Sequence, residues 1–448
     1  MTQRVYALED PSLGNRAYLL VVGGGLAAAI DPPRDTEALL SLADRHGLRV
    51  VASLETHLHA DFVGGSRELA ERTGADVYAA KDADLRFGHI GVGEGDLLRV
   101  GGVELSVLHT PGHTPEHVSY VADGLDLFSG GSLIVGGAAR TDLVDPARIA
   151  DLTRSQFQSI RRLATLPEGT VLYPTHGSGS FCSAGTAQTA GTTVGQQRRT
   201  NPLLLIDDED AFVETFTEGF GSFPPYFLHL RPVNREPMLL SDLPPARPMS
   251  AMKVAEAVAE GAWLIDARTV DAWAFSHPVG AISNAIRPEF ASWLGWIVPF
   301  GEPVVLLADE GDLSEGLRQA RRIGYDRVLG WIEGGIEAWT AAGFETRTAE
   351  QIGAVEAKRR QERGDVILDV RQRSELANRV PASVHIELGE LIVGGTDGLG
   401  GAGDVIVHCG HGERSATGVS LLERYGVRAA NLDGGIQAWR EAGLPLAS

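Results

Sequence analysis

The sequence predicts an α/β protein of three domains, and three features of the chain lead to this prediction. The first 200 or so residues alternate short apolar runs with segments of helical character, and the runs end in polar or glycine-rich turns, as strand–loop–helix units do. Seven prolines then lie between Pro224 and Pro248, which is typical of a stiff, extended linker. The remainder of the chain contains an internal repeat, and 448 residues suffice for about two to four domains.

The repeat consists of two separate motifs that recur at nearly the same distance. Residues 263–268 (Trp-Leu-Ile-Asp-Ala-Arg) match residues 366–371 (Val-Ile-Leu-Asp-Val-Arg), and residues 332–339 match residues 432–439. The aspartates of the first motif are 103 residues apart, and the closing tryptophans of the second are 100 residues apart. Two copies of one α/β domain of about 100 residues explain both distances. The predicted domains are residues 1–245, 246–347 and 348–448.

Composition excludes several classes of function. The formal net charge of -20 argues against a nucleic acid or an anionic membrane surface as a partner, because both require a basic surface. The two cysteines, Cys182 and Cys409, are too few for the disulfide framework of a secreted domain. The N-terminal segment has no apolar signal core, and no apolar run is long enough to span a membrane. We therefore expect a cytoplasmic protein, and the sequence leaves open whether it forms a homo-oligomer.

Histidines gather in three separate segments of the first domain. Residues 56–65 read Thr-His-Leu-His-Ala-Asp-Phe-Val-Gly-Gly and come one residue after an apolar run. His57, His59 and Asp61 alternate, so an extended segment would place all three on one side of a strand end. A single His-x-His pair is usually accidental, but two further histidine segments follow in this domain.

The second segment, residues 109–117, contains Thr-Pro-Gly-His-Thr with His113, and the third places His176 directly after Tyr-Pro-Thr. Neutral imidazoles together with a carboxylate are good ligands for iron or zinc. The three segments together therefore indicate a metal site.

These motifs resemble the metallo-β-lactamase superfamily, whose fold is an αββα sandwich, and most closely its persulfide dioxygenase branch, close to glyoxalase II. The resemblance implies His57 and His113 as iron ligands, with His59 adjacent and with Asp61 and His176 in or near the surrounding shell. It also implies one ferrous ion per chain rather than zinc. In binuclear relatives a histidine for a second metal stands where this chain has Phe62, so the resemblance implies a mononuclear site at most.

One ligand of that family set is absent. The family carries an aspartate at the end of the strand that follows the Pro-Gly-His-Thr motif, and this chain reads Leu-Phe-Ser-Gly-Gly-Ser over residues 127–132, with Gly131 at that position. Either water, His59 or Asp61 fills the vacant position, or the domain has lost its oxidation chemistry. An aspartate at position 131 is expected to restore metal binding, because an anionic third ligand completes a facial set.

Cys182 follows His176 by six residues and matches a cysteine of the same family. The resemblance implies a thiol near the metal that accepts or relays sulfane sulfur. The alternative is an ordinary small apolar residue on a loop.

The second cysteine lies in the segment Val-Ile-Val-His-Cys-Gly-His-Gly-Glu-Arg-Ser-Ala-Thr, residues 405–417. A β-branched run ends before Cys409, and a glycine-rich loop leads into a helical segment. This arrangement places the sulfur over backbone N–H groups at a helix N-terminus, where a thiolate is stabilised. Arg414 adds a positive charge. The pattern Cys-x-x-Gly-x-Arg-Ser resembles the rhodanese active-site loop, and only four residues separate Cys409 from Arg414, whereas the related phosphatase loop has five.

The middle copy has no such loop. Its equivalent segment, residues 308–314, reads Ala-Asp-Glu-Gly-Asp-Leu-Ser and contains neither cysteine nor arginine. We expect this copy to be an inactive rhodanese-like domain with a structural role.

The function implied by these resemblances is a persulfide dioxygenase fused to a rhodanese sulfurtransferase that works through a Cys409 persulfide. The expected partners are a low-molecular-weight thiol persulfide, thiosulfate or sulfite. Two alternatives stay open. The first domain could be a metal-poor binding module attached to a sulfurtransferase, or the chain could be a glyoxalase II-like thioester hydrolase.

Overall fold

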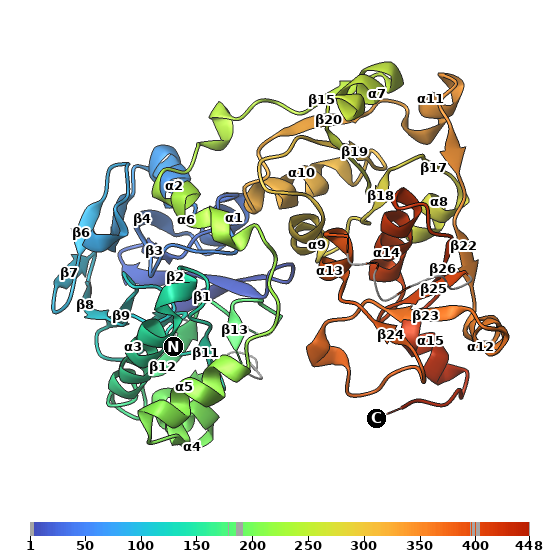
Figure 1. Cartoon of the computed structure of the whole chain (residues 1–448). Coiled ribbons are helices and arrows are strands. Elements are labelled where there is room, and N and C mark those ends of the chain that lie inside the picture. The colour runs from blue at the N-terminus through green and yellow to red at the C-terminus, as the bar shows by residue number, and fades with distance from the viewer. Residues whose placement is uncertain are drawn as a thin grey trace. The chain divides into compact units, whose positions relative to one another are not determined.

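The computed structural model describes residues 4–177, 179–184, 191–394, 396, 399 and 404–447 (Figure 1). The chain divides into two compact units. The first contains residues 1–243 with Arg321–Gly324, and the second contains Pro244–Ala320 with Tyr325–Ser448. No helix in the described part of the chain is both long enough and apolar enough to cross a membrane.

The first unit begins with a six-stranded sheet in which neighbouring strands follow chain order. Strands β1 to β3 pair antiparallel, and β3 to β6 pair parallel. The strands are β1 (Val5–Asp10), β2 (Asn15–Gly23), β3 (Leu26–Ile30), β4 (Arg49–Leu54), β5 (Asp76–Ala80) and β6 (Ile90–Val92). Two helices cover its outer face, α1 (Glu37–Arg45) and α2 (Ser66–Thr73), and they bury Leu39, Leu42 and Leu69 against it.

The second sheet of this unit has the order β14-β12-β10-β9-β8-β7. Its strands are β7 (Leu97–Val100), β8 (Val103–His109), β9 (Val118–Ala122), β10 (Asp126–Gly130), β12 (Val171–Pro174) and β14 (Thr192–Thr193). The helices that follow are α3 (Ile149–Leu163), α4 (Val194–Thr200) and α5 (Glu209–Glu218). Phe157 of α3 and Phe212 of α5 pack in one buried cluster with Leu127 of β10, so these helices cover the outer face of the second sheet.

The two sheets face each other across a shared core. Leu20 and Leu54 of the first sheet are buried in one cluster with Val107 and Phe128 of the second. Alternate residues of the same strands, such as Leu19, point instead toward the helices. Both faces of each sheet are therefore covered, which explains why these strands read as continuous apolar runs. The predicted αββα sandwich is confirmed.

The proline-rich segment is not the extended linker that its composition predicts. It contains helix α6 (Phe227–Arg235), with Pro232 inside it, and this helix belongs to the first unit. The Asn234 amide donates to the carbonyls of His59 at 2.7 Å and Phe62 at 2.9 Å. The Tyr226 hydroxyl donates to the Asp61 carbonyl at 2.8 Å. Side-chain hydrogen bonding, which proline content does not predict, makes this segment a support for the histidine-rich loop.

The second unit contains the two repeated copies, which have the same sheet topology (Figure 1, yellow to red). Each sheet is parallel and five-stranded, and the order of its strands, numbered within each copy, is 1-5-4-2-3. The middle copy has strands β15 (Arg247–Met249), β16 (Trp263–Asp266), β18 (Ile282–Ser283), β19 (Val304–Leu307) and β20 (Val328–Ile332). The last copy has β22 (Glu350–Ile352), β23 (Val366–Asp369), β24 (Val384–His385), β25 (Val405–His408) and β26 (Ala429–Leu432).

Helices flank both sheets. Those of the middle copy are α7 (Ala251–Ala259), α8 (Val270–Phe275), α9 (Phe290–Ile297), α10 (Leu313–Arg322) and α11 (Gly335–Ala341). Those of the last copy are α12 (Ala354–Arg363), α13 (Leu388–Ile392), α14 (Glu413–Arg424) and α15 (Gly435–Glu441). Two short pairs, β11 (Ala138–Ala139) with β13 (Ser183–Ala184) and β17 (His277–Pro278) with β21 (Thr346–Arg347), complete the strands.

The repeated motifs have the same structural role in both copies. Asp266 and Arg268 form a buried ion pair after β16, and Asp369 and Arg371 form the matching pair after β23. Arg371 also donates to the backbone carbonyls of residues 375 and 378, so the pair shapes the loop that follows the strand. The matching Trp-Leu-Ile-Asp-Ala-Arg and Val-Ile-Leu-Asp-Val-Arg segments are therefore a structural device rather than a site by themselves.

Candidate functional site

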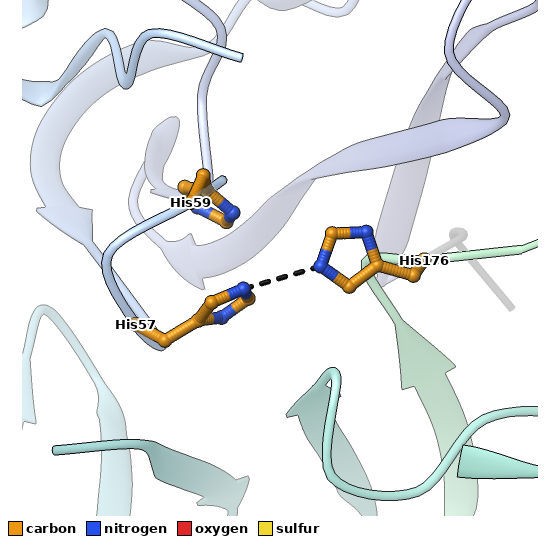
Figure 2. Close-up of side chains that lie close together, drawn as sticks. All are labelled: His57, His59 and His176. Carbon is orange, nitrogen blue, oxygen red and sulfur yellow. Dashed lines mark hydrogen bonds between the residues drawn. The ribbon is translucent and has the colours of Figure 1, made fainter. Parts of the chain in front are cut away.

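Five buried histidines form a cluster where strands of the two sheets of the first unit end. His57 and His59 follow β4, His176 follows β12, and His113 and His117 lie in the loop between β8 and β9. All five side chains are at most 4% exposed. Figure 2 shows the rings of His57, His59 and His176 facing one another. Sequence segments more than 100 residues apart therefore meet at one point.

Asp31, at the end of β3, fixes the strand ends that carry this cluster. Its carboxylate accepts hydrogen bonds from the Thr56 backbone N–H and hydroxyl, both at 2.7 Å, and from the Thr175 hydroxyl. Burial raises the pKa of Asp31, but the charge of His59 and these hydrogen bonds outweigh burial, so the pKa lies below its usual value. An ionised Asp31 thus joins the two sheets beside the cluster.

Hydrogen bonds determine which nitrogen of His57 carries its proton. The Thr56 hydroxyl donates to Asp31, so it accepts from the Nδ1–H of His57 at 2.8 Å. The Nε2 of His57 then has a free lone pair, and it lies 3.1 Å from Nε2 of His176 (Figure 2).

The other two imidazoles are held in the same tautomer. His176 Nδ1–H donates to Asn15 Oδ1 at 2.9 Å, while the amide of Asn15 donates to Asp61 at 2.7 Å. His113 Nδ1–H donates to the Arg140 carbonyl at 2.6 Å. The His113 Nε2 atom is buried and has no hydrogen-bond partner among the described residues.

The Nε2 atoms of His57 and His176 therefore face each other, and a nitrogen of His113 lies within 4.8 Å of a nitrogen of His176. Two such lone pairs only 3.1 Å apart repel each other unless a proton or a cation lies between them. Burial and the neighbouring imidazoles hold the pKa values of His57 and His113 well below the usual value, which disfavours an added proton. The donor set therefore fits a metal cation, and outer hydrogen bonds of this kind are typical of histidine ligands.

His59 lies in the cluster but differs in charge. One of its nitrogens is 3.5 Å from an Asp31 oxygen and 3.3 Å from a Glu55 oxygen, and its ring stacks on Phe62 at 4.0 Å. Burial lowers the pKa of His59, but Asp31 and Glu55 overcome this and raise it to about 10. One atom each of His57, His59 and His176 lie within 4.8 Å of one another, so His59 belongs to the cluster as an imidazolium that balances two carboxylates.

Asp61 also lies in this shell. Its Oδ2 atom accepts from Asn15, and its Oδ1 atom is buried without a hydrogen-bond partner in the described structure. Burial raises the pKa of Asp61, but His176 and the Asn15 hydrogen bond lower it more strongly, so the carboxylate is ionised.

His117 has a structural role that sequence reasoning missed. Its ring stacks on that of His57 with centroids 4.9 Å apart, and its Nε2 accepts the Gly131 N–H at 3.0 Å. Its Nδ1–H therefore points to the Thr110 hydroxyl at 2.9 Å, and burial is the main cause that lowers the pKa of His117 to about 3. The sequence signal for His117 is its place three residues after the Pro-Gly-His-Thr motif, at the end of the histidine segment 109–117.

The space that the missing aspartate would need is occupied. A Cβ atom at Gly131 would lie 2.5 Å from Cδ2 of the His113 ring and 3.0 Å from Cβ of Ala139. Contacts that short require the His113 ring to move. The prediction that an aspartate at this position restores metal binding therefore requires the His113 ring to move.

Cys182 follows β12, far from His113 in sequence, and its side chain also joins the cluster. Its side chain is fully buried, and its sulfur, a nitrogen of His113 and a nitrogen of His176 all lie within 4.8 Å of one another. Burial and the nearby Asp61 carboxylate raise the pKa of the Cys182 thiol well above its usual value. A free Cys182 is thus a neutral thiol.

The second candidate centre lies between β25 and α14 of the last copy. The Cys409 sulfur accepts the Gly412 N–H at 3.2 Å and the Ser415 hydroxyl at 3.5 Å, and it is 1% exposed in total. Gly412 has φ of +122°, a backbone conformation that favours glycine. The loop thus turns donors at the N-terminus of α14 toward the sulfur, as the sequence predicts.

Arg414 is not a free cation. Its guanidinium donates two hydrogen bonds to the Glu375 carboxylate, at 2.5 and 2.7 Å. Burial raises the pKa of Glu375, but the pairing with Arg414 outweighs burial, so the pKa of Glu375 is lowered. Burial lowers the pKa of Arg414, but the pairing with Glu375 outweighs burial, so the pKa of Arg414 is raised. The Cζ atom of Arg414 lies over the ring of Trp293, 5.3 Å from the ring centroid, and Trp293 belongs to α9 of the middle copy. Sequence reasoning missed both partners, because neither lies in the cysteine loop.

Comparison with known families identifies the domains. Residues 13–176 match the model of the metallo-beta-lactamase superfamily, and residues 250–342 and 353–442 match that of the rhodanese-like domain. The chain is a metallo-β-lactamase domain fused to two rhodanese-like domains.

Relatives of the metallo-β-lactamase domain include hydroxyacylglutathione hydrolases. The protein from Methylobacillus flagellatus is 38% identical over 174 residues, which are 38% of this chain and 64% of that protein. The protein from Xanthomonas campestris is 36% identical over 159 residues, which are 35% of this chain and 59% of that protein. The chain thus spans about three fifths of the length of these curated relatives.

A solved structure matches more than this one domain. The crystal structure of a metallo-beta-lactamase from Staphylococcus aureus is 27% identical, with a TM-score of 0.65, and the match covers 73% of this chain and 98% of that one. The domains of this chain belong to families of enzymes, which supports enzymatic activity. The histidine cluster of the metallo-β-lactamase domain supports metal binding.

The first test concerns Gly131 in the metallo-β-lactamase domain. Gly131→Asp is expected to destabilise the domain, because overpacking typically costs about 1–3 kcal/mol, and not to increase its metal content. Thermal unfolding and elemental analysis measure both quantities. Gly88→Asp is the matched control, since nothing lies within 4 Å of a Cβ there. A rise in metal content in Gly131→Asp would show that the glycine is simply a missing ligand.

The second test concerns the charge beside Cys409 in the last rhodanese-like domain. Arg414→Ala leaves the Glu375 carboxylate uncompensated, so alkylation of Cys409 should require a higher pH, and sulfur transfer should slow by about 10²–10³-fold. Glu375→Gln should shift the alkylation profile to lower pH. Arg428→Ala, whose side chain is 84% exposed, is the control and should leave the profile unchanged. If the alkylation profile shifted in the same direction and by the same amount in Arg414→Ala and Glu375→Gln, the pair would only hold the loop together.

Proposed function

We propose that the chain is an enzyme of sulfane-sulfur metabolism. Cys409 transfers sulfur as a cysteine persulfide, and the metallo-β-lactamase domain oxidises a low-molecular-weight thiol persulfide at a metal ion. The observation that carries the proposal is the pair of donors at Sγ of Cys409, the Gly412 N–H and the Ser415 hydroxyl, at the start of α14. These donors stabilise the negative charge that a sulfurtransferase must hold on its cysteine.

The transfer proceeds in two balanced steps. The Cys409 thiolate attacks the outer sulfur of thiosulfate, the sulfur–sulfur bond of thiosulfate breaks, and sulfite leaves with the electron pair. An acceptor thiolate then attacks the outer sulfur of the Cys409 persulfide and releases the Cys409 thiolate. The Gly412 N–H and the Ser415 hydroxyl donate to Sγ of Cys409, the atom that carries the negative charge before the first step and after the second.

The middle rhodanese-like domain takes no part in this chemistry as a sulfur carrier. It has no cysteine. Its contribution is the ring of Trp293, which lies over the Arg414 guanidinium. This contact restricts the position of Arg414 and removes water from one face of its ion pair.

The oxidation step is assigned to the metallo-β-lactamase domain because its three Nε2 lone pairs suit a cation. His57, His113 and His176 would hold the ion, while Thr56, Asn15 and the Arg140 carbonyl keep each proton on Nδ1. A ferrous ion held there would supply activation of dioxygen beside the bound persulfide.

A narrow pocket reaches the histidine cluster of this domain. Its lining includes His57, His59, Leu58, Leu85 and Phe87. Neither lysine nor arginine is among its described lining residues. Its cavity volume of about 20 Å³ is room for about one water molecule, so a thiol persulfide would enter only if lining side chains move.

Thioester hydrolysis is the second candidate, because the matched relatives are hydroxyacylglutathione hydrolases. Phe62 and Gly131 weigh against it, since neither offers a ligand for a second metal. Hydrolysis of S-acyl glutathione thioesters by the purified protein, with loss of that hydrolysis in His113→Ala, would favour this candidate over persulfide oxidation.

The test of sulfur transfer is Cys409→Ser. This variant should lose thiosulfate-dependent transfer of sulfur to cyanide or a thiol, because a hydroxyl cannot form a persulfide. Thiocyanate formation measures the activity, and circular dichroism with thermal unfolding checks the fold. Turnover like that of the unaltered protein would contradict the assignment of Cys409.

The test of oxidation is His113→Ala. It removes a buried nitrogen that has no other partner in the described structure, so metal content and oxygen uptake with glutathione persulfide or a smaller thiol persulfide should both fall to background. His46→Ala is the control, because His46 is an exposed histidine of the same domain. Undiminished oxygen uptake in His113→Ala would exclude this cluster as the oxidation site.

A further inference from the structure

The metal cluster has a sulfur donor as well as nitrogen donors. The Cys182 sulfur lies within 4.8 Å of nitrogens of both His113 and His176. All three side chains are fully buried. A donor group this compact, with its soft sulfur atom, matches the mixed sulfur and nitrogen sets that bind zinc, cobalt and iron in proteins.

One residue fixes both Cys182 and His113. The Arg140 carbonyl accepts the His113 Nδ1–H at 2.6 Å, and the Arg140 N–H donates to the Cys182 carbonyl at 2.8 Å. The pairing of β11 with β13 continues this register, because Ala139 is the partner of Ser183. The loop after β12 is thereby held against the loop after β10, and the relative position of the sulfur and the imidazole is set by backbone hydrogen bonds.

A second observation indicates that this group faces a ligand. His113 Nε2 is a buried atom without a hydrogen-bond partner in the described structure, and a vacant buried lone pair is costly. His176 Nε2 is in a similar position, because it lies 3.1 Å from Nε2 of His57, which also carries a lone pair. A cation bound to these nitrogens satisfies both lone pairs.

Once a divalent cation is bound, its charge favours the thiolate form of Cys182. Three neutral imidazoles leave a divalent ion with its full charge in a buried site, and Gly131 supplies no carboxylate. Asp61 is ionised nearby, with Oδ2 held by the Asn15 amide and Oδ1 without a partner among the described residues. The compact donor group with His113 and His176, however, contains the Cys182 sulfur and not Asp61. A thiolate would supply the negative charge from the opposite loop.

We propose that Cys182 is a metal ligand of the metallo-β-lactamase domain, and that with His113 and His176 it replaces the carboxylate missing at Gly131. The inference rests on the proposed metal site. Coordination forms a metal–sulfur bond and breaks the S–H bond of Cys182, and the proton goes to solvent without any transfer of electrons. It also implies that the site prefers ions that accept sulfur, such as zinc, cobalt and ferrous iron, over manganese or magnesium.

The experiment is an anaerobic titration of the metal-free full chain with Co²⁺, followed by absorbance. Ligand-field bands report that Co²⁺ binds, and a near-ultraviolet thiolate-to-cobalt charge-transfer band reports that sulfur is a ligand. The Cys409→Ser variant is the decisive sample, because Cys182 is then the chain's only cysteine. We expect the charge-transfer band in that variant and in the unaltered chain.

Cys182→Ser should lose the charge-transfer band and bind Co²⁺ at least about tenfold more weakly, the lower bound for altered surroundings of a metal ligand. Ligand-field bands without the charge-transfer band in Cys409→Ser would overturn the inference and leave the metal site standing. No ligand-field bands in any sample would overturn the metal site together with the inference. Absorbance does not depend on turnover, so a chain that shows both bands but oxidises no persulfide would refute the proposed oxidation and still support Cys182 as a ligand.

Discussion

The structure of the first domain depends on where three histidines keep their protons. His57, His113 and His176 each donate Nδ1–H to an oxygen, and those oxygens come from Thr56, the Arg140 backbone and Asn15. Because each Nδ1 proton is donated to an oxygen, each Nε2 atom keeps its lone pair, and the Nε2 atoms of His57 and His176 lie only 3.1 Å apart. The cluster is therefore under electrostatic stress without a cation, and the surrounding framework of Asp31, the two sheets and α6 holds it in that arrangement. Metal binding is the physical state that this arrangement stabilises.

In the last domain, the start of helix α14 provides the hydrogen-bond donors around the Cys409 sulfur. The Cys409 sulfur lies in a buried loop and accepts hydrogen bonds from a backbone N–H and a hydroxyl at the start of α14. Glu375 neutralises Arg414, and Trp293 covers it. A free guanidinium would bind any anion tightly. The paired guanidinium holds the loop, and the hydrogen bonds at the Cys409 sulfur come from neutral donors.

Much of this could be predicted from the sequence, because the signals were local. Strand–loop–helix periodicity predicted an α/β domain, and the resemblance of its histidine motifs implied the sandwich. The repeated motifs predicted two copies of one domain, and the segment around Cys409 predicted its donors. The partners that decide charge could not be predicted, since they come from distant segments: Asn15 for His176, Arg140 for His113 and Glu375 for Arg414. The prediction of an extended linker in the proline-rich segment was wrong for the same reason. Its composition predicts a linker, but Asn234 and Tyr226 bind the histidine-rich loop through hydrogen bonds that no composition reveals. Gly131 was recognised as a missing ligand, yet only the structure shows that His113 fills its space.

The central claim is that the histidine cluster is a metal site despite the absent carboxylate. Elemental analysis of the full chain, purified anaerobically and compared with a His57→Ala, His113→Ala and His176→Ala triple variant, tests it most directly. Three Nε2 lone pairs should retain about one metal ion per chain through purification, and the triple variant should retain none. A chain without metal, and still without metal after incubation with Fe²⁺, Zn²⁺ or Co²⁺ and removal of the excess, would show that the cluster is a hydrogen-bonded core and that the first domain has no metal chemistry.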